Sequence, residues 1–207
     1  MSSASLPIFP IAYFPPVPWF AAAAQHERIG VEVCQHFRKQ QLTNRMHIKI
    51  TNRILPLSIP VERRGTTSPI REKKISYAED WRGHHWKSLI ASYRNSPYFM
   101  YYEAELYELY QRKPVFLMDW LRACLEWSIK QLRLDLEVEE TTSFKQVIEK
   151  DFRQTFDPGL KHLPESFEIR SYPQVFEGFT PGLSILDLLN NEGPQSTALL
   201  KASWTRI

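Results

Sequence analysis

The chain has 207 residues, of which 43% are hydrophobic and 24% charged, a balance that excludes an intrinsically disordered protein. Cys34 and Cys124 stand far apart, which excludes a disulfide framework and indicates a reducing compartment. Prolines interrupt the apolar N-terminus, no Lys or Arg precedes Arg28, and no apolar run approaches the ~18 residues of a spanning helix. We therefore expect a cytoplasmic protein, free or attached to a membrane surface, without a signal peptide or transmembrane segment.

The net charge of +3 is unevenly distributed along the chain. Residues 1–100 contain 14 Lys and Arg against 6 Asp and Glu, whereas residues 101–207 contain 12 against 17. The basic half suits an anionic small molecule, such as a phosphate, nucleotide or carboxylate, although ordinary solvated charge remains the alternative. Nucleic acid is not expected as a partner, because the basic residues are scattered and form no block or helical stripe.

The first part of the chain predicts a β-α-β unit. A short apolar run at 6–11 indicates a buried strand, and the prolines that follow indicate a stiff loop. Residues 19–27 predict a helix and the β-branched run 29–34 a second strand, a spacing typical of parallel strands joined by a helix. The loop after the first strand would then lie where α/β folds commonly bind ligands.

The next segments predict a hairpin and then helices. Residues 47–61 form the hairpin around Thr51–Arg53, and a short strand follows at 73–77. The expected helices begin after Asp80 as a cap, after Ser96 and Pro97, and after Pro114.

The last third mixes both kinds of structure. Residues 136–144 predict a strand, 144–156 a short helix, 172–178 an extended piece and 184–193 a helix capped by Ser184, followed by a last helical turn. We expect an α/β fold with an N-terminal mixed sheet around the β-α-β unit and a largely helical second half. Residues 1–207 would form one compact domain: strand-rich over 1–78, helical over 79–134 and mixed over 135–207.

The motif WRGHHW at the start of the first long helix carries two adjacent histidines. Helical spacing places Trp86, Leu89, Ile90 and Tyr93 on the apolar face. A neighbouring stripe of the helix comprises Trp81, His84, His85, Ser88 and Ser92. This stripe would line a cleft, in which a histidine acts as general base and the other side chains form hydrogen bonds or contacts with the substrate. Capping and packing explain the histidines about equally well. A metal site is not expected, because adjacent histidines diverge by about 100° on a helix.

A second group of polar residues lies between Glu32 and Arg45. Glu32 would accept a proton from an attacking amine, while Lys39 and Arg45 would hold a phosphate or carboxylate, with Gln40 and Asn44 beside them. A salt bridge from Glu32 to Lys39 or Arg45 is the structural alternative.

Three further side chains have competing interpretations. Tyr13, in the proline-rich loop, would stack on a sugar or a base or pack in the core. Cys34 could act as a nucleophile, but a lone strand cysteine is more often buried and inert. Asp187 sits among leucines and would cap a helix, orient a neighbour or line the site.

Motifs for several enzyme classes are absent from the sequence. There is no GxxxxGK[ST], GxGxxG or GxSxG, which argues against a P-loop ATPase, a dinucleotide-binding dehydrogenase and a serine hydrolase. No cofactor is evident; an activated acyl donor or a nucleotide-linked donor made elsewhere would supply the reacting group.

Several segments together resemble the WbqC-like family. They are AYFPPVPWFAAAAQ, the region Arg38–Arg45, LSIPV, ISYAEDWRGHHWKSLIASYRNSPYFMYYE, and YPQVFEGF with LSILDLLNNEGP, in family order from Tyr13 to Pro194. Within them, His85 matches the family's single histidine before the second tryptophan, and Thr43 stands where the family pattern has arginine.

The resemblance implies a role in surface-polysaccharide or O-antigen assembly, a lipopolysaccharide pathway. The implied activity is transfer of glycine or a similar acyl group to an amino sugar, with other glycan-assembly enzymes as partners. Two alternatives remain: a non-catalytic protein that binds a nucleotide-sugar or acts as a scaffold, and a nucleotidyltransferase suggested by the β-α-β unit. The nucleotidyltransferase alternative lacks a His-x-Gly-His pair after the first strand.

Overall fold

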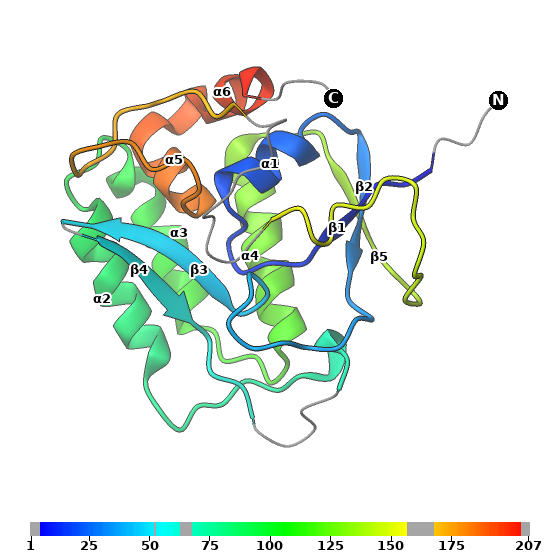
Figure 1. The fold of residues 1–207 in the computed structure, drawn as a ribbon. Coiled ribbons are helices and arrows are strands. Elements are labelled where there is room, and N and C mark those ends of the chain that lie inside the picture. Colours follow the sequence, from blue (N-terminus) through cyan, green and yellow to red (C-terminus); the bar gives the residue numbers. More distant parts are fainter. Residues whose placement is uncertain (1–4, 52, 63–67, 157–167, 204–207) are drawn as a thin grey trace.

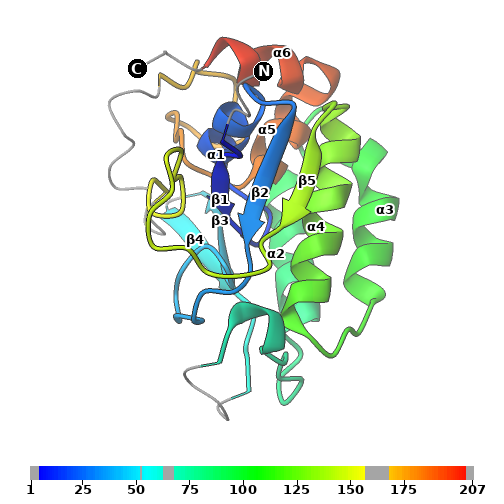
Figure 2. The same ribbon diagram turned by 90° about the vertical axis from the view of Figure 1, so that its right-hand side faces the viewer.

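The structure, a computed structural model, confirms the α/β fold and its β-α-β unit (Figure 1). It describes residues 5–51, 53–62, 68–156 and 168–203. Three parallel strands form one sheet in the order β1-β2-β5, and in Figure 2 their arrowheads point the same way. The elements are β1 (Ile8–Pro10), α1 (Val17–Ala23), β2 (Arg28–Glu32) and β5 (Glu137–Glu140).

The expected hairpin forms a second, antiparallel sheet from β3 (Arg45–Ile50) and β4 (Arg53–Ser58). Asn52 of its turn lies outside the described residues. His47 faces Pro56 in the register, and the His47 carbonyl accepts a hydrogen bond from the Ser184 amide at 2.8 Å. Because that carbonyl points away from β4, His47 and Pro56 form a pair whose backbone groups face outward. The missing N–H of Pro56 therefore removes no bond between the two strands.

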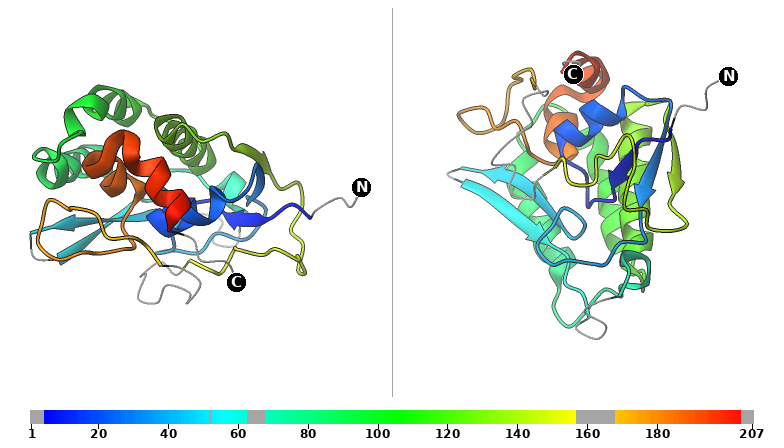
Figure 3. Two further views of the ribbon diagram at one scale, coloured as in Figure 1. Left: turned by 90° about the horizontal axis from the view of Figure 1, so that it is seen from above. Right: turned by 45° about the vertical axis from the view of Figure 1, so that its right-hand side comes forward.

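Three helices form a layer on one side of the strands, visible as the green ribbons in Figure 3. They are α2 (Trp81–Tyr93), α3 (Phe99–Gln111) and α4 (Leu117–Leu132). The expected cap of α2 is confirmed, since the Asp80 carboxylate accepts a hydrogen bond from the Gly83 amide at 3.1 Å. The expected Ser96 cap of α3 is wrong: Ser96 instead donates its hydroxyl to the Tyr93 carbonyl at 2.6 Å and closes the end of α2.

The C-terminal helices complete the core. They are α5 (Ile185–Glu192), the short η2 (Gly193–Gln195) and α6 (Ser196–Ala202). The Ser184 hydroxyl accepts a hydrogen bond from the Leu186 amide at 3.3 Å, which confirms the predicted cap. The apolar residues of α5 are fully buried and belong to one core with residues of α1, α3 and α4.

The predicted helix at 144–156 is wrong, because this segment is irregular and runs beside β1. Ile8 donates its amide to the Lys150 carbonyl at 2.9 Å and accepts from the Phe152 amide at 2.8 Å. Phe152 stacks on Phe9 of β1 with ring centroids 4.5 Å apart. Pairing with an existing strand thus overrides the helical spacing of the apolar residues.

Two predicted extended segments also differ from expectation. At 73–77 the chain makes only isolated bridges, from Lys74 to Phe116 and from Ile75 to Val61. A short 3-10 helix, η1 (Ile70–Glu72), precedes them. Residues 172–178 form a loop. Within the described residues, no helix has the length and apolar character needed to cross a bilayer.

Candidate functional site

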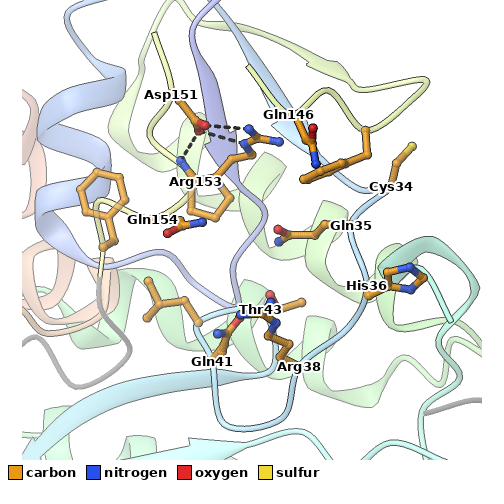
Figure 4. Close-up of a pocket in the computed structure, with 14 residues that line it drawn as sticks. Cys34, Gln35, His36, Arg38, Gln41, Thr43, Gln146, Asp151, Arg153 and Gln154 are labelled. Carbon is orange, nitrogen blue, oxygen red and sulfur yellow. Dashed lines mark hydrogen bonds and ion pairs between the residues drawn. The ribbon is translucent and has the colours of Figure 1, made fainter. Parts of the chain in front are cut away.

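A cavity of about 840 Å³ opens at the carboxyl ends of β1 and β2 (Figure 4). Parallel sheets commonly bind ligands at this end, and the volume suits a small molecule. The loop after β2 and the irregular segment beside β1 supply most of the wall. Its residues are Pro10, Cys34, Gln35, His36, Arg38, Gln41, Leu42, Thr43, Phe144, Gln146, Asp151, Arg153, Gln154 and Phe156.

An ion-pair cluster forms one wall of this cavity. The Arg153 guanidinium donates to both Asp151 carboxylate oxygens, at 2.9 and 2.6 Å, and its Nη1 lies 3.4 Å from Glu32 Oε2. The same Nη1 donates to the Lys145 carbonyl at 2.8 Å. The hydrogen bonds from Arg153 hold the pKa of the Asp151 carboxyl below its usual range, although burial opposes this effect. Asp151 is therefore ionised at neutral pH.

Glu32 is fully buried behind this wall. Besides Arg153, its carboxylate accepts hydrogen bonds from the amides of Cys34 and Gln35, at 2.7 and 3.2 Å, and from the Thr141 hydroxyl at 2.9 Å. The predicted salt bridge to Lys39 or Arg45 is wrong, because Arg153 is the partner. A carboxylate held by this many donors fixes the end of β2 and the loop that follows.

Two cations differ in what they can offer a ligand. A guanidinium has five N–H donors, and Arg153 uses four within the described chain, which leaves one hydrogen on Nη2. Arg38 is exposed and has no hydrogen bond or ion pair to the described residues. Arg38 can therefore bind a phosphate or carboxylate through two parallel hydrogen bonds.

Four primary amides, Gln35, Gln41, Gln146 and Gln154, provide much of the remaining polar surface of the cavity, together with His36 and Thr43. In Figure 4, Gln35 and Gln154 reach toward each other from opposite sides, while Arg38 and Gln41 lie across from Asp151. Each amide carries two donors and one acceptor, so such a lining matches a ligand with several hydroxyl groups. The rings of Phe144 and Phe156 add apolar wall.

The predicted catalytic histidine lies elsewhere, in the aromatic core. The Tyr13 hydroxyl is hydrogen-bonded to His85 Nδ1 at 3.0 Å and also to the Tyr110 hydroxyl. The ring of Trp81 meets His85 edge-on, with centroids 5.2 Å apart. The structure thus brings Tyr13, Trp81 and His85 together in the core, away from the cavity at the strand ends.

Burial controls the protonation of this cluster. It lowers the pKa of His85 to about 4, assisted by the neighbouring His84 and opposed by a hydrogen bond with the Ser58 backbone. It also raises the pKa of the Tyr13 hydroxyl well above its usual value. His85 is therefore neutral at physiological pH, and the residue is 4% exposed.

The predicted core face of α2 is wrong in part. The buried residues are Trp81, His85, Leu89, Ser92 and Tyr93, whereas Trp86 and Ile90 are half-buried. Because α2 packs between α3 and β3, its buried stripe is wider than apolar spacing indicates. Ser88 donates its hydroxyl to the His84 carbonyl at 2.9 Å, so it serves the helix and not a cleft.

The polar residues predicted after β2 divide into two groups. Lys39 and Gln40 are exposed on a turn, and Gln40 has a φ of 63°. Asn44 is buried and donates to the Ile59 carbonyl at 3.0 Å, while Arg45 donates to the Ser58 hydroxyl at 2.8 Å. Asn44 and Arg45 thus tie the start of β3 to the end of β4.

Comparison with known proteins gives one match. A profile of the WbqC-like protein family matches residues 11–158 and 157–199, nearly the whole chain. The chain belongs to the WbqC-like family. No curated protein and no solved structure matches it. The family match therefore confirms the resemblance seen in the sequence.

Several cavity residues of this WbqC-like chain escaped the sequence analysis. Arg38 and Gln41 flank the predicted pair Lys39 and Gln40, and Thr43 precedes the predicted Asn44. Asp151 and Arg153 lie in the segment predicted as a helix, where nothing local marks them. Asp151 and Arg153 flank Phe152 in the chain, and their closeness to the carboxylate of Glu32 is visible only in three dimensions. Among the described residues, no three His, Cys, Asp or Glu side chains lie close enough to hold a metal ion.

Proposed function

We propose that the protein is a cytoplasmic transferase of surface-glycan assembly that binds an anionic sugar substrate in the cavity at the strand ends. It transfers glycine or a similar acyl group to an amino sugar. In this step the amine nitrogen forms a bond to the acyl carbon, the bond from that carbon to the donor's leaving group breaks, and the amine proton leaves to water.

The observation that carries this proposal is the lining of the cavity. Arg38 offers a guanidinium that no described residue compensates, which suits a phosphate or carboxylate, and glutamine amides offer donors and acceptors for hydroxyls. The Asp151 carboxylate faces the same space and suits the amino group of a sugar. Membership of the WbqC-like family supports the pathway in which such a substrate occurs.

Mass spectrometry of the surface glycan tests the proposal. The glycan from cells with the gene should carry a group whose mass is missing without the gene. Arg38→Ala should abolish this group by removing the substrate anchor. Lys87→Ala, which removes an exposed cation on the outer side of α2, should leave the glycan unchanged. If the Arg38→Ala strain has normal protein levels and its glycan still carries the group, the proposal is wrong.

One observation favours the second candidate, a non-catalytic protein that binds a nucleotide-sugar or acts as a scaffold. Glu32 and His85 are both buried and already hydrogen-bonded, and neither side chain is among the residues that line the cavity. Calorimetry with a nucleotide-sugar distinguishes the candidates. Binding without turnover, and glycan loss only when a protein complex is lost, would favour the second.

A further inference from the structure

One end of the molecule gathers three chain segments into a single surface, here called the basic end face. It comprises residues 34–39, 69–77 and 112–116. Ile70 donates its amide to the Gln35 carbonyl at 3.0 Å, and Ile75 donates to the Val115 carbonyl at 3.0 Å. Figures 1 and 2 show η1 and the α3–α4 connection side by side at this end.

The charge of the basic end face is strongly positive. Its three segments contain seven basic residues and one acidic residue, Glu72. Glu72 lies 3.8 Å from Arg71, so it is already partly compensated. All of the basic residues except Lys73 are exposed: Arg38, Lys39, Arg71, Lys74, Arg112 and Lys113.

Two exposed apolar side chains sit among these cations. Val115 is 57% exposed and Phe116 is 39% exposed, immediately before α4 begins. The Lys74 ammonium lies over the Phe116 ring, 6.0 Å from its centroid. Exposed apolar residues among cations suit a lipid bilayer with anionic headgroups, because its surface is charged and the region just below the surface is apolar.

We propose that the basic end face binds an anionic bilayer surface. The cations would lie among lipid headgroups, with Val115 and Phe116 entering the boundary with the acyl chains. A polyanion such as nucleic acid would match the charge but leave these two side chains unused. Exposed carboxylates border the face at Glu62, whose amide donates to the Lys74 carbonyl, and at Glu79 and Asp80, which follow the second segment in the chain.

Binding in this orientation has a consequence for the cavity. Arg38 belongs both to the basic end face and to the cavity wall, so the cavity would open beside the lipid headgroups. A substrate carried on a lipid could then reach the cavity without leaving the membrane. The surface itself does not depend on the proposed transfer reaction, and vesicle binding can be measured without a substrate.

Co-sedimentation of the full chain with vesicles tests the proposal. The protein should bind vesicles of phosphatidylglycerol and phosphatidylcholine, bind pure phosphatidylcholine far more weakly, and release as the salt concentration rises. The double variant Lys74→Glu with Lys113→Glu should lose at least about 25-fold in affinity, because each basic residue near such a surface strengthens binding by about fivefold. Val115→Ser should weaken binding at every salt concentration by up to about tenfold.

The matched control is Lys87→Glu with Lys201→Glu, which changes the net charge equally on α2 and α6. It should keep nearly all of the vesicle affinity. An equal loss in this control, no binding of the unaltered protein to anionic vesicles, or an affinity for Val115→Ser that is unchanged would each overturn the proposal. Thermal unfolding of every variant shows whether the fold survives.

Discussion

At the scale of single residues, Arg153 connects the wall of the cavity to the parallel sheet. Its side chain is 6% exposed and lies between the carboxylates of Asp151 and Glu32, which are far apart in the sequence. A buried carboxylate without a counter-ion is costly, so this arginine holds the end of β2 against the segment beside β1.

Replacing Arg153 by Met should lower the free energy of unfolding by about 3–5 kcal/mol, because Glu32 would remain buried without its ionic partner. Adding Glu32→Gln should restore part of this loss. Urea unfolding measures both effects. The control is Arg122→Ala, whose ion pair with Glu140 lies at the surface and should contribute less than about 1 kcal/mol. Equal effects at positions 153 and 122 would contradict this account.

Two buried groups should give the stability opposite dependences on pH. The pKa of His85 falls to about 4 on folding, so His85 destabilises the fold as pH drops from about 6.5 to 4. Burial raises the pKa of Asp187 to about 6, although hydrogen bonds from Tyr172 and Gln174 oppose this shift. Asp187 therefore destabilises the fold as pH rises from about 4 to 6.

Single variants should separate these contributions, each up to about 3 kcal/mol. In His85→Gln, the unfolding free energy should fall as pH rises from 4 to 6, because the Asp187 effect remains. In Asp187→Asn it should fall as pH drops from 6.5 to 4. Chemical unfolding across this range measures both slopes, and slopes of the same sign would refute the assignment.

The residues predicted in the segment after β2 lie near the cavity, but several of them are chain neighbours of the residues that actually line it. The segment after β2 was predicted to bind ligand through Lys39, Gln40, Asn44 and Arg45, whereas Arg38 and Gln41 line the cavity. Successive side chains of a turn point in different directions, and no spacing rule fixes which one points inward. The pairing of Glu32 with Arg153 spans 121 residues, so only the folded chain reveals it.

At the scale of elements, the sequence predicted those whose signals are local. The cap at Asp80 and the apolar spacing of α4 and α5 rest on neighbours in the chain, and these elements form as expected. The segment 144–156 has a helical spacing of apolar residues, yet pairing with β1 holds it extended. The same long-range contact places Asp151 and Arg153 in the cavity.

Gly193, where α5 ends, should tolerate no side chain. Its φ is 51°, and an added Cβ would lie 2.5 Å from Tyr98 Cδ1. Gly178 has a φ of 75° but open space around it. Alanine at this position therefore measures the cost of a positive φ alone, without a steric clash. Gly178→Ala should lower the unfolding free energy by about 1–2 kcal/mol and Gly193→Ala by clearly more. Equal losses in urea unfolding would show that the Tyr98 ring moves aside freely.

At the scale of the whole molecule, the first and last parts of the chain share one core. Apolar residues of α5 are fully excluded from solvent against α1, α3 and α4. The core therefore closes only when the last third of the chain has docked.

A chain cut after Leu183 should lose cooperative unfolding. The four apolar residues Ile185, Leu186, Leu188 and Leu189 are each worth about 1.5–3 kcal/mol on burial, and together they approach the total stability of a domain. Near-ultraviolet circular dichroism and urea titration measure the loss. A chain that ends at Ser203 keeps every described element and is the control; a cooperative transition in the shorter chain would contradict the expectation.

The outward-facing Pro56 of β4 has a consequence for the protein in concentrated solution. A strand at the border of a sheet presents free amides to which strands of other molecules can add, a first step toward aggregation. Pro56 interrupts that row of donors at the middle of β4 without weakening the hairpin. Pro56 thus hinders separate molecules from pairing edge to edge. Its replacement should lower the solubility of the protein more than its free energy of unfolding.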